Sequence, residues 1–142
     1  MSNIDFSQVV TPEAKAAMAR VALFADLARI RWKAETGGIT LQDGTTLPSD
    51  EVTARKLTSA VTSLQNGMVS EPVAWKFPGG WQDLTQAQIE AAAAAVAQHV
   101  QACFSAERAV HQQIEALSDA DLAGFDVPAV FDAALAAPAA ET

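Results

Sequence analysis

The sequence predicts a mostly helical α+β fold with three main helices, the last of them long and heptad-patterned, and two short β-hairpins. Helical stretches that begin with capping residues alternate with two β-prone segments, each containing a glycine turn. The last helical stretch carries apolar residues in alternate steps of four and three. A chain of 142 residues suits one domain with tails and can bury a core of its own.

The first helix is predicted from Thr11 to about residue 35, after an extended lead-in over residues 1–10. Thr11 can cap the helix, and Pro12 suits its first position because the missing N–H would have no partner there. Its apolar residues spread over more than one face, which predicts burial on a broad side. Gly37-Gly38 ends the helix, since glycine adopts the left-handed conformation easily.

Two hairpins are predicted, one on each side of a second helix. In the first, Asp43-Gly44 between β-prone residues predicts a type I′ turn, which needs positive φ at both central positions. In the second, Pro78-Gly79-Gly80 predicts a turn after the β-prone residues 73–77. Because a lone hairpin is marginal in water, one alternative is that both hairpins share a small antiparallel sheet.

The helix between the hairpins is predicted to begin after Ser49, whose hydroxyl can cap it. Asp50 and Glu51 place acids at the positive end of the helix dipole. Asn66-Gly67 is expected to end the helix.

The third helix is the longest predicted element and runs to about Leu117. Thr85 and Gln88 have the spacing of a capping box. The apolar positions that follow form an a/d heptad seam, which packs on the first helix within the chain or partly serves another chain. The positions proposed as a partner or self-association seam are Val96, Val100, Cys103, Glu107, Val110, Ile114 and Leu117.

The predicted organisation is a lead-in (1–10), a helix–hairpin–helix–hairpin–long helix domain (11–117), and an acidic, Ala/Pro-rich C-terminal segment (118–142) that is partly mobile. The formal net charge is -8, which argues against binding to nucleic acid or to anionic lipid. Acids dominate from residue 107 onward. This bias favours a solvated surface, with a docking surface for a basic partner as the alternative.

No catalytic, cofactor-binding or metal site is predicted. His99, Cys103 and Glu107 are spaced i, i+4 and i+8 on one helix, so three ligands there cannot converge well on one ion. The sequence contains no Gly-x-Ser-x-Gly elbow and no phosphate-binding loop. With one cysteine, no intrachain disulfide can form. We therefore expect a protein that is not an enzyme.

The sequence also predicts where the three tryptophans lie and in which compartment the protein is found. Trp32, Trp75 and Trp81 are typical of binding hot spots and of cores that cover a small sheet, and the core is favoured. The first residues lack a basic stretch followed by an apolar run, and no segment approaches the roughly 20 apolar residues of a membrane span. A cytoplasmic protein is expected.

Two stretches resemble small tail-module proteins of bacteriophages and prophages. Residues 4–17 resemble the start of many such proteins, and residues 31–114 resemble an uncharacterised domain found in the tail-fibre region. The matching landmarks are Trp32 before Glu35-Thr36-Gly37-Gly38-Ile39, Ser49-Asp50, Trp75-Lys76, and His99-Val100-Gln101-Ala102-Cys103-Phe104 with Glu107.

The resemblance implies a tail-associated protein that acts by binding. It implies either a tail-fibre assembly helper or an accessory structural component of the tail or baseplate, with a tail-fibre or baseplate protein as partner. A homodimer or homotrimer is a further alternative. The protein would act in the host cytoplasm during assembly, or stay in the virion tail. The competing hypothesis is a small acidic regulatory or inhibitory phage protein whose Asp119, Asp121 and Asp126 occupy a basic site on a host protein.

Overall fold

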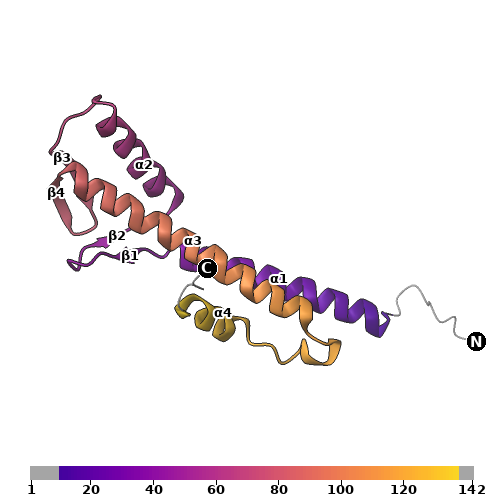
Figure 1. Cartoon of the computed structure of the whole chain (residues 1–142). Helices are drawn as coiled ribbons and strands as arrows, with labels where there is room; N and C mark the ends of the chain where they lie inside the picture. The colour runs from indigo at the N-terminus through magenta and orange to yellow at the C-terminus, as the bar shows by residue number, and fades with distance from the viewer. Residues whose placement is uncertain (1–9, 138–142) are drawn as a thin grey trace, which may run out of the picture. The chain divides into compact units, whose positions relative to one another are not determined.

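The computed structural model describes residues 10–137, which form a mostly helical α+β structure and confirm the predicted fold class (Figure 1). The elements are α1 (Pro12–Thr36), β1 (Ile39–Thr40), β2 (Thr46–Leu47), α2 (Glu51–Gln65), β3 (Val73–Phe77), β4 (Gly80–Leu84), α3 (Gln86–Ala116), the 3₁₀ helix η2 (Asp119–Asp121) and α4 (Val127–Ala136). Predictions for residues 1–9 and 138–142 lie outside the described residues.

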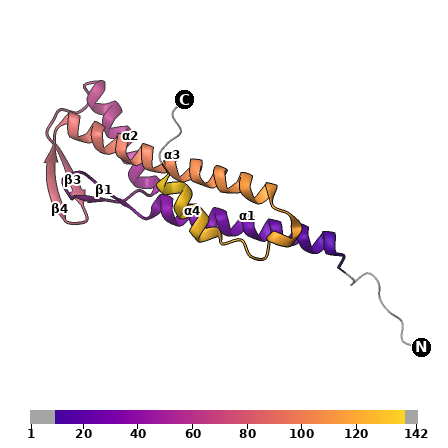
Figure 2. The same ribbon diagram turned by 60° about the horizontal axis from the view of Figure 1, so that its bottom comes forward.

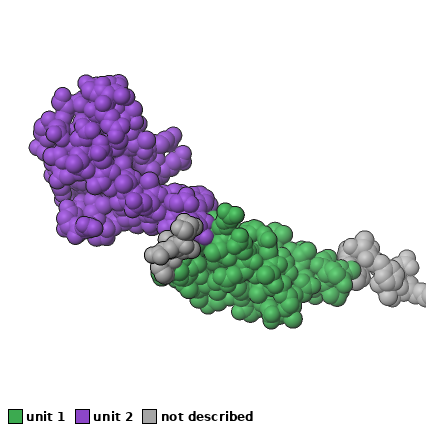
Figure 3. Space-filling model, in the orientation of Figure 1, with its two compact units in different colours: residues 1–30, 106–142 green, residues 31–105 purple. Residues whose placement is uncertain are grey.

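The chain divides into two compact units (Figure 3). Unit 1 comprises residues 1–30 and 106–142, and unit 2 comprises residues 31–105. Helices α1 and α3 each contribute one part to unit 1 and the other part to unit 2. The described residues after 117 therefore belong to a unit that also contains most of α1.

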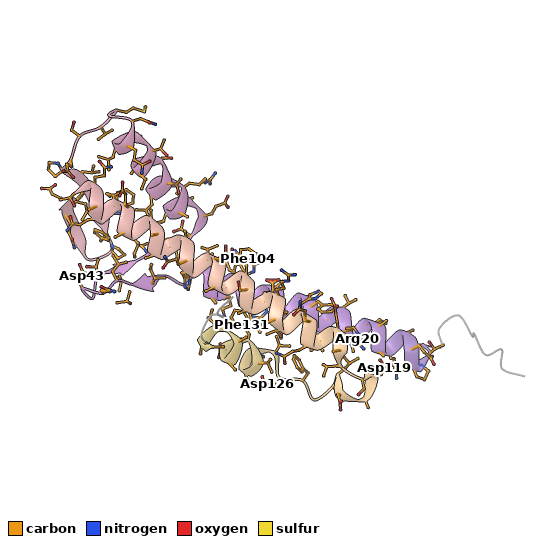
Figure 4. All side chains as sticks on the ribbon, viewed as in Figure 1. Arg20, Asp43, Phe104, Asp119, Asp126 and Phe131 are labelled. Atoms are coloured by element: carbon orange, nitrogen blue, oxygen red, sulfur yellow. The ribbon has the colours of Figure 1, made fainter. Side chains whose placement is uncertain are left out.

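In unit 1, the first part of α1, the last part of α3, and α4 lie side by side (Figures 1 and 2). The buried side chains there are Leu27, Ala106, Val110, Ile114, Leu122, Val127 and Phe131. Arg20 donates to the carbonyl oxygens of Ile114 and Leu117, the latter at 3.2 Å, and pairs with Asp119 at 3.2 Å (Figure 4). Arg20 thus binds the Ile114 carbonyl in the last turn of α3 and the Leu117 carbonyl directly after the helix, where backbone carbonyls lack a full set of helical partners.

Helix α4 brings apolar side chains of the C-terminal segment into unit 1. Its N-cap is Asp126, whose carboxylate accepts a hydrogen bond from the Ala129 N–H at 3.2 Å. Val127 and Phe131, one turn apart on α4, are both buried. The C-terminal segment, predicted from the sequence to be partly mobile, thus contains a helix with a buried face.

In unit 2, the first part of α3 packs with α2 and both hairpins around one apolar cluster. Its buried members are Leu47, Leu57, Leu64, Phe77, Leu84, Ile89, Ala92 and Val96. The hairpins form two separate two-stranded antiparallel sheets, so the alternative of one shared sheet is wrong. Each hairpin buries apolar side chains against this cluster, which stabilises it without a third strand.

The turn of the first hairpin also differs from the prediction. Gly44 has φ +88°, but no non-glycine residue among residues 10–137 has positive φ, so the turn is not type I′. The Gly44 N–H donates to the Leu41 carbonyl at 2.9 Å, and the Leu41 N–H donates to the Thr45 carbonyl at 2.8 Å. This is the pattern of a type I turn followed by a left-handed glycine. Asp43 favours it by accepting a hydrogen bond from the Thr45 N–H at 2.9 Å.

The N-cap of α2 is Asp50 and not Ser49 as predicted. The Asp50 carboxylate accepts from the Thr53 N–H at 3.3 Å and from the Thr53 hydroxyl at 2.6 Å. Ser49 is buried and turned toward the end of α1. The other boundaries of α2 agree with the prediction, since it ends at Gln65 and Gly67 follows with φ +71°.

The cap at Asp50 predicts a pH-dependent contribution to stability. The hydrogen bond from the Thr53 side chain lowers the pKa of Asp50 from its usual 3.8. Since the pKa is lower in the folded chain, this contribution is complete above about pH 3.8 and is lost as the pH falls through the folded-state pKa. By NMR titration, Asp50 should titrate below 3.8, and Thr53→Val should raise its pKa toward that value. Thr58→Val, which removes a different α2 hydroxyl, is the control. If Thr53→Val left the pKa of Asp50 unchanged, the Thr53 hydroxyl would not be the cause of the lowered pKa.

Helix α3 begins with the predicted capping box. The Thr85 N–H donates to Gln88 Oε1 at 2.9 Å, and the Gln88 N–H donates to Thr85 Oγ1 at 3.2 Å. Two N–H groups without helical partners are thus satisfied reciprocally. The helix ends at Ala116, one residue before the predicted end. None of the helices within residues 10–137 is long and apolar enough to cross a bilayer.

Candidate binding surfaces

The proposed association seam of α3 faces the interior of the chain. Val96, Cys103, Val110 and Ile114 are fully buried. The remaining three positions, Val100, Glu107 and Leu117, are half-buried. Of the two alternatives for the seam, the structure shows packing within the chain. A role for these residues in binding another chain stays a prediction.

Two of the three tryptophans lie at the surface, so the expectation of a core position is wrong for them. Trp32 is exposed because it lies roughly 140° around α1 from the buried Leu27. Trp81 is exposed on the outer face of the second hairpin, opposite Lys76, whose Nζ lies 5.7 Å from the ring centre. Trp75 points to the other face and packs against the unit 2 cluster.

Some landmarks of the phage resemblance come together at the end of α1, in unit 2. The Ser49 hydroxyl, whose residue is 1% exposed, donates to the Glu35 carbonyl at 2.6 Å and accepts from the Gly38 N–H at 2.9 Å. Arg31 forms an ion pair with Glu35 and lies over the ring of Phe104, 4.5 Å from its centre. Residues far apart in the sequence therefore hold the end of α1 to the start of α2 and to α3, and we call this cluster of Arg31, Glu35, Gly38, Ser49 and Phe104 the junction.

His99 and Cys103 belong to the same junction. His99 Nε2 lies 2.9 Å from the Ala34 carbonyl, a contact that requires the proton on this nitrogen. Cys103 is buried with its Sγ 3.8 Å from His99 Nε2. Burial, and then the charge of Glu35, raises the pKa of the Cys103 thiol, so the sulfur stays protonated and is a weak nucleophile. Residues 10–137 contain no group of three His, Cys, Asp or Glu side chains arranged to hold a metal ion.

The acidic residues of the C-terminal segment have local partners in unit 1. Asp119 pairs with Arg20, Asp121 accepts a hydrogen bond from the Ser118 hydroxyl at 2.8 Å, and Asp126 caps α4 (Figure 4). These carboxylates stabilise the ends of helices and turns. They remain exposed to solvent as well.

Helix α1 leaves one apolar face uncovered in unit 1. Met18 and Val21 are 65% and 66% exposed. Ala14 and Ala25, which are also exposed, extend this face in steps of four and three residues. The opposite side of the helix carries Leu27, which is buried in unit 1. We call Ala14, Met18, Val21 and Ala25 the α1 face.

Unit 2 contains a groove of about 610 Å³ between its two hairpins and α3. The apolar part of its lining, which we call the floor, consists mainly of alanines of α3, with Phe77 and Leu84 from the second hairpin. The polar part of the lining, which we call the rim, includes glutamines and one acid, Asp43, from the turn of the first hairpin. Asp43 is labelled in Figure 4. The volume lies within the range of roughly 300–1,000 Å³ that is typical of ligand sites.

The family comparison covers both units. A family model described as "Domain of unknown function (DUF4376)" matches residues 18–135. The chain belongs to the DUF4376 family. The DUF4376 match begins in α1, ends in α4 and includes the junction, the groove and most of the α1 face. No curated protein and no solved structure matches the chain.

Sequence reasoning missed both the α1 face and the groove. The α1 face had a signal, because the apolar residues of the first helix follow more than one side of the helix. The groove had none, because alanines that floor a groove have the same sequence pattern as alanines that favour a helix.

Proposed function

We propose that this DUF4376 protein is a tail-associated protein of a bacteriophage or prophage that acts by binding a tail-fibre or baseplate protein, and not by catalysis. The resemblance of residues 31–114 to the tail-fibre-region domain supports the phage setting. As an assembly helper it would act in the host cytoplasm and leave the particle. As a structural component it would stay in the virion tail.

The α1 face is the observation that carries the binding proposal. Large apolar side chains such as Met18 and Val21 are usually buried when they recur along a helix. The steps of four and three from Ala14 to Ala25 are the spacing at which one helix packs against another. The occupant that fits is therefore an amphipathic helix of the partner, which lays its own apolar stripe along this face.

Co-expression with the tail-fibre protein of the same phage, followed by size exclusion and light scattering, tests the proposal. We expect a defined complex with the unchanged chain and its loss with the double variant Met18→Gln/Val21→Gln. Met68→Gln is the matched control, since Met68 is 74% exposed but lies in unit 2. If the chain formed no complex with the fibre protein, the proposal would be overturned. If the chain alone formed a dimer or trimer that the double variant lost, the α1 face would bind a second copy of the chain.

Mass spectrometry of purified virions then separates the two forms of the proposal. A tail component is found in the particles, whereas an assembly helper is absent from them. Because Asp119, Asp121 and Asp126 have structural roles in unit 1, the acidic regulatory alternative is better examined by Asp132→Lys, which changes an exposed acid of the same segment. Loss of a host phenotype in this variant, without loss of fold, would favour that alternative.

A further inference from the structure

We propose that the groove of unit 2 binds an extended peptide segment of the partner that carries lysine or arginine and lacks acidic residues. This inference rests on the proposed function for the identity of the partner, and it adds the chemistry of a second contact. The groove lies wholly in unit 2, whereas the α1 face lies in unit 1. The two surfaces can therefore be tested separately.

The floor of the groove favours a chain that approaches closely. Ala91, Ala92, Ala94 and Ala95 of α3 present only methyl groups there. Phe77, together with Leu84, adds larger apolar surface at the second hairpin. A floor of small side chains leaves room for a peptide backbone and for the apolar stems of long side chains.

The rim supplies hydrogen-bonding groups that suit a peptide backbone. Gln42 comes from the first turn, Gln82 from β4 and Gln98 from α3. An amide side chain both donates and accepts, as does each peptide unit of an extended segment. Strand β4, which contributes Gln82 and Leu84 to the lining, pairs only with β3 among the described residues. An unpaired edge is a template for an added extended chain.

Charge decides which peptides fit. Asp43 is the one charged residue of the lining within residues 10–137, and no lysine or arginine contributes to it. Hydrogen bonds from Thr45 lower the pKa of Asp43, so the carboxylate stays ionised near neutral pH. The groove therefore attracts a basic side chain and offers no counter-charge to a phosphate or an acidic peptide.

Panning a library of random short linear peptides on the full chain tests the inference. We expect selected peptides to contain lysine or arginine and few acids. Ala91→Trp, which fills the groove from an exposed position of α3, should lower the affinity for the best synthetic peptide at least about tenfold. Ala102→Trp is the matched control on the same helix, outside the groove, and should leave binding unchanged.

Asp43→Asn provides an independent variant that keeps an oxygen to accept from the Thr45 N–H. Asp43→Asn should lower the affinity for the basic peptide and reduce the salt dependence of its binding. Asp132→Asn in unit 1 should do neither. Circular dichroism establishes that each variant is folded. The inference would be overturned if the selected peptides were acidic. It would also be overturned if neither Ala91→Trp nor Asp43→Asn changed their affinity.

The fibre complex distinguishes this inference from the proposed function. Peptides that bind in the groove while no fibre complex forms would uphold the groove and overturn the proposed function. A fibre complex that survives Ala91→Trp and Asp43→Asn but is lost with Met18→Gln/Val21→Gln would uphold the function and overturn the groove as a partner contact.

Discussion

Replacing Phe131 by alanine should lower the free energy of unfolding by about 3–5 kcal/mol, the usual cost of truncating a buried phenylalanine. Phe131 is 1% exposed and lies in α4, within unit 1 (Figure 4). The loss combines the transfer of the ring from water with the cavity that remains. Urea denaturation followed by circular dichroism measures it.

The neighbouring Asp132→Ala is the control for Phe131→Ala, because Asp132 is exposed on the same helix. It should change the free energy of unfolding by less than about 0.5 kcal/mol. A cost below about 1 kcal/mol for Phe131→Ala would mean that α4 is not part of the unit 1 core. The expected result instead makes the C-terminal helix a structural requirement of this unit.

Replacing Ser49 by alanine should lower the free energy of unfolding by about 2–4 kcal/mol, the second large effect. The change removes the partner of the Gly38 N–H and the donor to the Glu35 carbonyl, and a buried polar group left unsatisfied costs about 1–3 kcal/mol. Ser59→Ala, at an exposed position of α2, should be close to neutral when measured in the same denaturation experiment. Equal stability of the two variants would show that the Ser49 hydroxyl does not hold the junction.

Elements defined by local signals were predictable from the sequence. The capping box at Thr85 and Gln88 involves residues three apart, and the turn between β3 and β4 is set by Pro78 and the glycines that follow. Such bonds depend on neighbouring residues alone. This is why the element types were confirmed and their ends differ by only one or two residues.

Features set by distant contacts were not predictable. A serine before Asp50 matches a cap, and only the folded chain brings Ser49 to the carbonyl of Glu35. The same limit applies to Trp32, since its apolarity says nothing about which side of α1 the rest of the chain covers. The α3 seam illustrates the converse, because heptad spacing is the same for a partner inside the chain and for one outside it.

The candidate surfaces were predictable only in part. The apolar residues of α1 spread over more than one face and predicted burial on a broad side, but Met18 and Val21 are exposed in the structure. The groove depends on the separation of the two hairpins, and the hairpins are separate because each buries its own apolar residues on the helices. No local pattern encodes that separation.

All three tryptophans lie in unit 2, at positions 32, 75 and 81, and the chain contains no tyrosine. Tryptophan fluorescence therefore follows unit 2 alone, while far-ultraviolet circular dichroism follows the helices of both units. Where the two signals melt together, the units unfold as one cooperative system. Where they separate, the change in emission marks the unfolding of unit 2, and the ellipticity that remains comes from unit 1. The tryptophans of the native chain therefore act as a fluorescent probe of one of its two units.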